Sequence, residues 1–443
     1  MKRWLFVVAL AGCGDDTQPF AVDAAIDSPS HGDGGSDLVC PSQVPDDPLL
    51  PMRQGCMFQA GAKASQTLGL SEPDRMRIPI RHIVVIMKEN HAFDHYFSQL
   101  KATQPDIEIF PTGFTNPDLT GAQVAPFHTA TTCIHIDPDH QWSAMHAMVN
   151  GGRMDGFVTS AANSTGSDGH YAMSYLDATD LPFYYFLANT YAISDHHFPS
   201  VRSGTFPNRD YMLMGTSDNV HSTNGTVWPD PSQPLIFDFL DRANVTWGVY
   251  SDDGNPFEGT LADPANNWGQ QHPYHPVANL IAAFAAGDVP NVVFVDGREY
   301  VEDEHPTADV QVGEAWTKRI YDAAITSPVW PTTAIILTYD EAGGFFDHMP
   351  PPNACLARPQ DTDFFELGVR VPLIAISPWA RRHYVSHAIQ DHTSITRFIE
   401  AVYGLPAMTA RDANADAMLD MFDFHCPPED IPRAPAAGTG GCH

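Results

Sequence analysis

Residues 81–90 read RHIVVIMKEN, an apolar run followed at once by a carboxylate and an amide. A continuous apolar run of this length is typical of a parallel strand that is buried on both faces. Similar runs occupy residues 245–250, 291–295, 333–339 and 371–376. Together these runs predict the strands of one mainly parallel sheet.

Helix-like stretches lie between the runs, at residues 141–149, 181–190, 235–243, 277–285, 312–325 and 394–402. Strands that alternate with helices predict an α/β sandwich. The sequence between the runs contains neither an internal repeat nor a linker rich in Pro and Ser. We therefore expect one domain, over residues 38–443, with long loop insertions.

The composition excludes some classes of protein. The chain has 443 residues, with 54 Asp and Glu against 23 Lys and Arg and a formal net charge of −31. A polyanion of this kind is repelled by nucleic-acid phosphates, so we expect no nucleic-acid partner. The 32 Gly and 38 Pro indicate many loops, where functional sites are usually built. The 21 His are groups that transfer protons and bind metals near neutral pH.

The N-terminus has the form of an export signal. Residues 1–12 read MKRWLFVVALAG, two basic residues followed by an apolar run that is too short to span a bilayer. Residues 10–13, Leu-Ala-Gly-Cys, resemble a bacterial lipobox, which implies cleavage before Cys13 and a lipid anchor on its sulfur. A plain secretory signal is the alternative. Residues 13–37 predict an acidic flexible tether, so we expect an exported protein, either a lipoprotein of the cell surface or outer membrane or a secreted protein.

Cysteines in an exported chain predict disulfides. If Cys13 is lipidated, six cysteines remain, and six cysteines allow 15 pairings. The absence of a C-x-x-C motif from the sequence disfavours a structural zinc cluster. Closeness along the chain favours Cys40 with Cys56 and Cys426 with Cys442, which leaves Cys133 with Cys355.

Metal-type ligands follow two of the runs. Glu89 and Asn90 follow the first run, and Asp340 and Glu341 follow the run at 333–339. Ligands of open α/β sheets bind beyond the carboxyl ends of the strands, and these oxygens are donors for hard divalent cations. We therefore expect one divalent metal ion at the four residues, of an identity that the sequence does not reveal. A helix cap at the first pair and a solvated acidic turn at the second are the alternatives.

Thr205 is the candidate nucleophile. It lies in Ser203-Gly204-Thr205-Phe206-Pro207-Asn208-Arg209, a pattern that indicates a tight turn entering a helix. Coordination to a cation can give a hydroxyl alkoxide character near neutral pH, and the backbone N–H groups of a helix start favour phosphate. The alternative is that Thr205 or Ser203 only caps the helix.

Histidines in loops are the candidate proton carriers. His140 begins a predicted helix, His272 lies in a Pro-rich loop, and His305 follows Asp303 and Glu304. We expect acidic neighbours to raise the pKa of such imidazoles and so to favour the protonated form. A surface or structural role is the alternative for each of them.

Assembled in order, these segments resemble the bacterial phosphoesterase family that contains non-haemolytic-type phospholipases C and related acid phosphatases. The family's opening signature is close to V-V-x-M-x-E-N-R-S-F-D-H-Y-F and corresponds to residues 84–97. Further family motifs match residues 137–142, 150–156, 180–185, 203–209, 304–306, 339–352 and 391–395. Ordered matches over about residues 80–403 are more specific than any one motif.

The resemblance implies an alkaline-phosphatase-like fold, which is a three-layer α/β/α sandwich with a mainly parallel sheet. It implies a covalent mechanism in which Thr205 is the nucleophile and His140 and His305 contact the phosphoryl oxygens or protonate the leaving group, with His272 as a further candidate. By the same resemblance, the metal ligands are Glu89, Asn90, Asp340 and Glu341.

The implied function is hydrolysis of phosphate esters, by a phospholipase C-type phosphodiesterase acting on phospholipids or by an acid phosphatase acting on small esters. A metal-stabilised surface protein without catalysis is a third reading. The chain departs from the family pattern at His91-Ala92, Ser203-Gly204 and Ala342, which flank the expected ligands. Aromatic residues at 183–186 and 345–346 either line an apolar entrance for lipid or belong to the core.

Overall fold

The computed structural model describes residues 44, 46–129, 131–223, 233–253, 274–426 and 431–441. The expected signal peptide and tether over residues 1–37 lie outside these ranges, as do Cys40, His272 and Cys442. Within the described ranges, no helix is long and apolar enough to cross a membrane.

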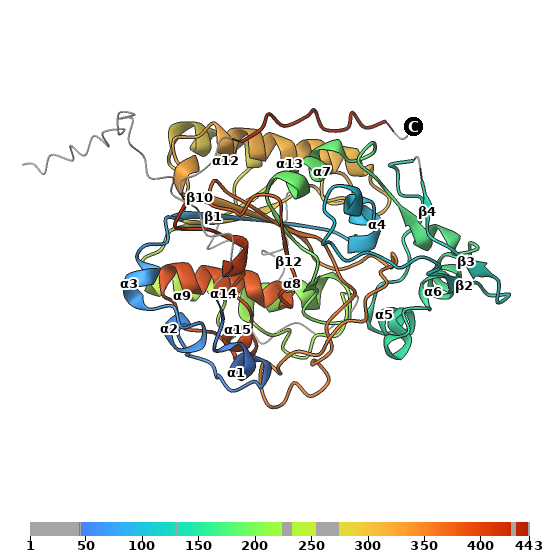
Figure 1. The fold of residues 1–443 in the computed structure, drawn as a ribbon, viewed down its shortest axis with the longest axis horizontal. Helices are drawn as coiled ribbons and strands as arrows, with labels where there is room; N and C mark the ends of the chain where they lie inside the picture. The colour runs from blue at the N-terminus through green and yellow to red at the C-terminus, as the bar shows by residue number, and fades with distance from the viewer. Residues whose placement is uncertain are drawn as a thin grey trace, which may run out of the picture. The chain divides into compact units, whose positions relative to one another are not determined.

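A seven-stranded sheet forms the centre of the described part of the chain (Figure 1). All adjacent strands pair in parallel except at β11, which is antiparallel to both of its neighbours. The expected mainly parallel sheet is confirmed, and each of the five apolar runs forms a strand. In spatial order the strands are β12 (Tyr384–Ser386), β6 (Ala192–Ser194), β11 (Leu373–Ile376), β10 (Thr333–Tyr339), β1 (His82–Lys88), β9 (Val292–Asp296) and β8 (Trp247–Ser251).

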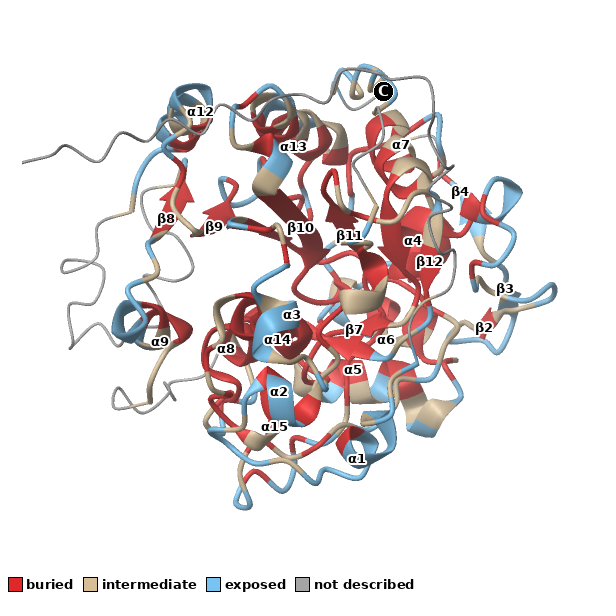
Figure 2. Cartoon of the chain, turned by 60° about the vertical axis from the view of Figure 1, so that its left-hand side comes forward, coloured by how far each residue is buried: buried red, intermediate tan, exposed pale blue. Residues whose placement is uncertain are grey.

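Helices cover both faces of the sheet, which makes three layers (Figure 1). Val84 and Ile86 point into the core on the side of α7, α12 and α13, whereas Val85 and Met87 point into the core on the side of α8, α9 and α14. The strands are accordingly buried on both faces (Figure 2). The bounds of these helices are α7 (Pro182–Thr190), α12 (Val277–Ala286), α13 (Val310–Ile325), α8 (Thr205–Met214), α9 (Ile236–Arg242) and α14 (His392–Tyr403).

Six predicted helices are present, with ends that shift by one or two residues. Two of these shifts have a clear cause, because Asp309 and Asp391 cap α13 and α14 and accept hydrogen bonds from the N–H groups of Gln311 and Thr393. The remaining α-helices and strands of the described residues are α1 (Leu50–Gln54), α2 (Ala64–Thr67), α3 (Glu72–Arg75), α4 (Phe93–Phe97), α5 (Trp142–Val149), α6 (Phe157–Thr165), α15 (Ala410–Asn414), β2 (Asn116–Pro117), β3 (Gln123–Val124), β4 (Phe127–His128), β5 (Ser174–Tyr175), β7 (His197–Phe198) and β13 (Gln390–Asp391).

A disulfide joins Cys56 to Cys355, although 299 positions separate the two residues in the sequence. The pair of Cys40 with Cys56, which closeness along the chain favours, and the remaining pair of Cys133 with Cys355 are therefore wrong. The fold brings the loop before β11 against the segment that follows α1, so distance along the chain does not report distance in space. Cys133 and Cys426 are also disulfide-bonded.

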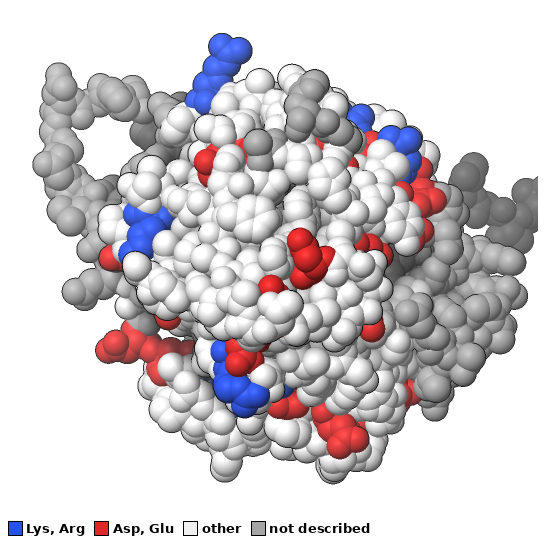
Figure 3. All heavy atoms as spheres, turned by 90° about the vertical axis from the view of Figure 1, so that its right-hand side faces the viewer, with Lys and Arg blue, Asp and Glu red and all other residues white. Residues whose placement is uncertain are grey.

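Charged side chains are scattered over the face drawn in Figure 3. Acidic groups lie singly or beside basic ones, and uncharged atoms form most of this face. The excess of Asp and Glu in the sequence therefore does not gather into one acidic patch on this side of the molecule.

Candidate active site

The register of β1 against β10 brings the four expected metal ligands together. Lys88 pairs with Tyr339 as the last residues of the two strands, and the N–H of Asp340 donates to the carbonyl of Lys88 at 2.9 Å. The N–H of Asn90 then donates to Oδ1 of Asp340 at 3.1 Å. Glu89 and Asn90 thus lie beside Asp340 and Glu341 at the carboxyl edge of the sheet.

The oxygens at this edge suit a divalent cation. Oδ1 of Asn90, Oδ2 of Asp340 and Oε1 of Glu341 are buried and have no hydrogen-bond partner among the described residues. Burial, together with the charge of Glu89, raises the pKa of Asp340 well above its usual range, and burial with the charge of Asp340 does the same to Glu341. Buried carboxylates that repel one another are relieved by a cation between them, and hard oxygen donors are the ligands of such cations.

Gly343 makes the close packing of this edge possible. Its φ of +62° is a left-handed conformation that favours glycine, and a Cβ there would lie 2.2 Å from the carbonyl oxygen of Asn90. The chain therefore turns away directly after Glu341 without displacing Asn90.

Thr205 is the first residue of α8, and Gly204 precedes it as the cap. The Thr205 hydroxyl donates to Oε2 of Glu89 at 3.2 Å, and the Ser203 hydroxyl donates to the carbonyl of His221. Neither side chain caps α8, so the alternative that Thr205 or Ser203 only caps this helix is wrong. Thr205 instead lies at a helix N-terminus, where phosphate is favoured, in contact with an expected metal ligand.

Arg209 is a further residue of the site, to which the sequence assigned no role. It lies one helical turn after Thr205, on the same face of α8. Its Nη2 binds Oε1 of Glu89 at 2.5 Å and its Nη1 binds Oδ1 of Asp296 at 2.8 Å. Asp296 is the last residue of β9, so attention to every strand end would have found it.

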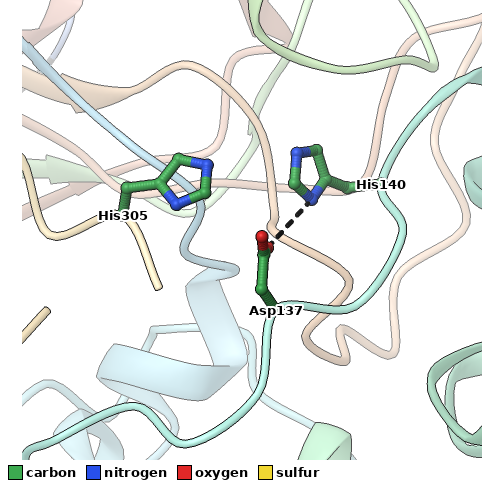
Figure 4. A group of neighbouring side chains, drawn as sticks. All are labelled: Asp137, His140 and His305. Carbon is green, nitrogen blue, oxygen red and sulfur yellow. Dashed lines mark ion pairs between the residues drawn. The ribbon is translucent and has the colours of Figure 1, made fainter. Parts of the chain in front are cut away.

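His140 and His305 face each other across the site, with Asp137 beneath them (Figure 4). Ligand atoms of these three residues lie within 4.8 Å of one another, so the group itself could hold a metal ion. Nδ1 of His140 lies 2.8 Å from the carbonyl of Pro138 and Nδ1 of His305 lies 2.5 Å from that of Pro306. In each ring Nδ1 therefore carries the proton in the neutral form, and Nε2 lies 3.3–3.4 Å from the Asn90 amide nitrogen.

The pKa of His140 differs from the expectation. Burial lowers it below the usual range and outweighs the opposing charge of Asp137, so the neutral imidazole is favoured. The expectation that an acidic neighbour raises this pKa is wrong for His140 because the ring is buried. His272, the third candidate, lies outside the described residues.

A cavity of about 570 Å³ opens onto Thr205, His140 and His305. Burial, and then the charge of Glu89, raises the pKa of Asp303 in its wall to about 7. Tyr300 also lines the cavity and is half exposed. Carboxylates are the commonest ionisable groups among the described lining residues: Glu89, Asp137, Asp139, Asp253, Asp296, Glu299 and Asp303.

The aromatic residues considered for a lipid entrance are core residues or pack against the core. Phe183, Phe345 and Phe346 are completely buried, and Phe186 packs against the same core. His91, one of the departures from the family pattern, is buried beside the carbonyl of Glu304, with Nε2 at 3.0 Å from it. This departure therefore alters packing and not the lining of the cavity.

Comparison with known proteins places the chain among phosphoesterases. The model of the Phosphoesterase family matches residues 80–406. The sequence is 31% identical over 412 residues to phospholipase C A of Mycobacterium tuberculosis, with 79% of this chain and 78% of that protein covered. It is 29% identical over 419 residues to non-specific phospholipase C1 of Arabidopsis thaliana, with 85% and 78% covered. A solved protein of the alkaline phosphatase superfamily from Vibrio parahaemolyticus matches with a TM-score of 0.33 and 11% identity, over 73% of this chain and 79% of that one.

Proposed function

Because the chain belongs to the phosphoesterase family, we propose that it is a metal-dependent hydrolase of phosphate esters that uses Thr205 as its nucleophile, and that its substrates are phospholipids cleaved in the manner of a phospholipase C. The observation that carries this proposal is the contact of the Thr205 hydroxyl with Glu89 at a helix N-terminus. Glu89 directly precedes Asn90, which has one of the three unpaired buried oxygens of this edge.

Glu89, Asn90, Asp340 and Glu341 would hold the metal ion. When bound, a divalent cation would neutralise charge on the phosphoryl group and lower the pKa of a nearby hydroxyl. Arg209 holds Glu89 in place through one nitrogen and Asp296 through another. The strand register and, for Glu89, the contact with α8 support these four residues as the ligands.

The reaction we propose has two steps. The Thr205 oxygen attacks phosphorus in line, the bond from phosphorus to the diacylglycerol oxygen breaks, and a phospho-threonine remains. Water then cleaves the phospho-threonine and restores the hydroxyl. Nε2 of His140 or His305 accepts a proton from the attacking oxygen and returns one to the leaving oxygen, which is the role of a neutral imidazole in acid–base catalysis. Positioning and charge stabilisation supply most of the acceleration in phosphoryl transfer.

The charge of the cavity favours a phospholipid over a phosphate monoester. A monoester brings close to two negative charges near pH 7, and the carboxylates of the wall repel them. A diester such as phosphatidylcholine brings one negative charge and a cationic head group. Tyr300, which lines the cavity and is 51% exposed, and the next residue Val301, which is 38% exposed, offer apolar surface to a lipid.

The test compares hydrolysis of phosphatidylcholine with that of p-nitrophenyl phosphate, for the wild-type protein and for Thr205→Ala. We expect the wild-type protein to prefer the phospholipid and Thr205→Ala to lose turnover of both substrates while it remains folded. Preference for p-nitrophenyl phosphate would support an acid phosphatase with the same centre. Turnover of neither substrate by the wild-type protein would support a metal-stabilised binding protein without catalysis.

We also propose that one phosphoesterase domain covers residues 38–443, after a signal peptide over residues 1–12 and a tether over residues 13–37, with a lipid anchor on Cys13. The lipobox-like Leu-Ala-Gly-Cys at residues 10–13 supports the anchor. Globomycin should block maturation of such a lipoprotein, and maturation that is unchanged by globomycin would show that the signal is a plain secretory one.

A further inference from the structure

We propose that Glu108, Asp195, His196 and His387 form a second metal site, for a divalent cation of the zinc type. We call these four residues the edge cluster. None of them lines the active-site cavity as the described residues define it, and the proposal does not depend on the proposed function.

The edge cluster is built by the same strand-end geometry as the active site. Ser194 and Ser386 pair as the last residues of β6 and β12, which run in parallel. The next residues are therefore adjacent, and the N–H of Asp195 donates to the carbonyl of Ser386 at 3.1 Å. The N–H of Glu108 donates to Oδ2 of Asp195 at 2.8 Å, which adds a third chain segment.

Three of the four residues in the edge cluster have ligand atoms near the spacing that a zinc ion needs, and Glu108 contacts one of them. Nδ1 of His387 lies 2.9 Å from Oδ1 of Asp195, and Nε2 of His196 lies 3.4 Å from Oε2 of Glu108. Ligand atoms of Asp195, His196 and His387 all lie within 4.8 Å of one another. A tetrahedral ion with bonds of about 2.0–2.1 Å sets its ligand atoms about 3.3 Å apart. Glu108 is not part of this close group of three, and its 54% exposed side chain would have to rotate to become the fourth ligand.

The hydrogen bond that Nδ1 of His196 donates leaves Nε2 to face Glu108. Nδ1 of His196 lies 2.7 Å from the carbonyl oxygen of His387 and must donate to it. In the neutral ring, Nε2 then presents a lone pair to the carboxylate of Glu108, which is repulsive unless a proton or a metal ion lies between them. Nearby Arg370 donates instead to the carbonyl oxygens of Asp195 and Glu108, at 2.7 and 3.0 Å.

The ligand types and their exposure favour zinc. Imidazole and carboxylate are both ligands of Zn²⁺, whereas Ca²⁺ and Mg²⁺ prefer oxygen ligands alone. The side chain of Asp195 is completely buried and that of His387 is 49% exposed. One ligand is therefore held by the surrounding protein, and an ion can reach the site from solution. A four-ligand site of this kind would be structural and would tie β6 and β12 to the segment of Glu108.

The test measures bound zinc per chain after equilibration with Zn²⁺ and gel filtration. The variants are His387→Gln, His196→Gln and Glu108→Gln, and the last of these changes a side chain that is 54% exposed and is the least disturbing to the fold. His383→Gln is the matched control, because this exposed ring contacts the carbonyl of Asn189. We expect each cluster variant to bind one zinc ion fewer than the wild-type protein and His383→Gln, with unchanged turnover of substrate.

A second measurement separates the edge cluster from the active site. Asp340→Asn should lose the active-site ion and keep the zinc ion of the edge cluster, and Zn²⁺ should still raise its melting temperature. Equal zinc content in the wild-type protein and all three cluster variants would overturn the proposal and show that the edge cluster holds only ion pairs between histidines and carboxylates.

Discussion

Nζ of Lys88 lies 2.6 Å from Oε1 of Glu304, and both side chains are completely buried. Lys88 directly precedes Glu89, and Glu304 directly precedes His305. The ion pair therefore joins the strand end that carries a proposed metal ligand to the loop that carries a proposed proton carrier. Hydroxyls of three tyrosines also donate to Glu304: Tyr96 at 2.8 Å, Tyr184 at 2.5 Å and Tyr339 at 2.7 Å.

Lys88→Met should lower the free energy of unfolding by about 3–5 kcal/mol, because it leaves the charge of Glu304 buried without its cation. Urea denaturation followed by circular dichroism measures this loss. The double variant with Glu304→Gln should lose less than the sum of the single variants. Lys318→Met is the control, because it removes an ion pair with Asp322 near the surface and should cost less than about 1 kcal/mol. An equal loss of unfolding free energy in the two lysine variants would show that burial of the Lys88–Glu304 pair does not raise its contribution.

Arg209→Lys should reduce kcat/KM by about 100-fold or more while the protein stays folded. A lysine has one charged nitrogen and cannot bind Glu89 and Asp296 at the same time, so the position of Glu89 is lost. Arg202→Lys is the control, since Arg202 pairs with Glu366 outside the cavity. Similar kinetics for the two variants would show that Arg209 does not position the site.

Asp340→Asn should lose the active-site metal ion and phosphoesterase activity together. The substitution removes the charge that, with Glu341 and Glu89, makes the site attractive to a cation. Metal analysis and turnover of the same preparation measure the two losses. Chelation of the wild-type protein should have the same effect on activity, and added divalent metal should restore the wild-type protein but not the variant. Full activity without bound metal would refute this site.

His348 should stabilise the protein at acidic pH and less so at alkaline pH. Burial lowers its pKa, but the hydrogen bond and charge of Asp94 and the charge of Asp347 outweigh burial, so the pKa lies above its usual value. The protonated ring is then favoured by folding, and its contribution is complete below about pH 6.5 and disappears as the pH rises through the folded-state pKa.

The measurement is the difference in unfolding free energy between the wild-type protein and His348→Gln, from about pH 5 to pH 9. We expect this difference to be largest at the acidic end and to shrink as the pH rises. A difference that is constant over the range would show that the ring does not titrate against Asp94.

Removal of the disulfide should destabilise the fold. Replacing Cys56 and Cys355 together by serine frees a loop of 299 positions in the unfolded chain and should cost about 2–5 kcal/mol. Thermal unfolding of the double variant, compared with the wild-type protein under oxidising and reducing conditions, measures the cost. The reduced wild-type protein should be destabilised at least as much as the double variant, because reduction also breaks the disulfides of Cys133 and Cys426.

Much of the fold follows from the pattern of apolar runs, because a buried parallel strand leaves a plain signal in the sequence. The antiparallel direction of β11 cannot be predicted in this way. An apolar run such as residues 371–376 has the same pattern in a parallel strand and in an antiparallel one. Strands β6 and β12 have three residues each, too few for any periodicity to show. The disulfide of Cys56 with Cys355 depends on tertiary structure, which pairing by neighbouring positions ignores.

The candidate site likewise has residues that the sequence predicts and residues that it does not. Glu89 and Asp340 were expected together because both follow strands, and the structure brings them together. Arg209 was not expected, because its role arises from the contact of α8 with two strand ends. Asp296 lies at a strand end and could have been found by the same rule as Glu89 and Asp340. The lowered pKa of His140 depends on how deeply the ring is buried, and a sequence does not reveal burial of a loop residue.

The pairing of β1 with β10 also limits where residues can be inserted into the chain or deleted from it. Successive residues of a strand point to opposite faces, so one residue inserted into either strand would turn Glu89 or Asp340 away from its partner. Asn90 and Asp340 are separated by 250 positions, and much of this stretch is not limited in the same way. Insertions in its surface loops leave the register of β1 against β10 unchanged. Insertions and deletions should therefore accumulate in the loops and be excluded from residues 82–90 and 333–341.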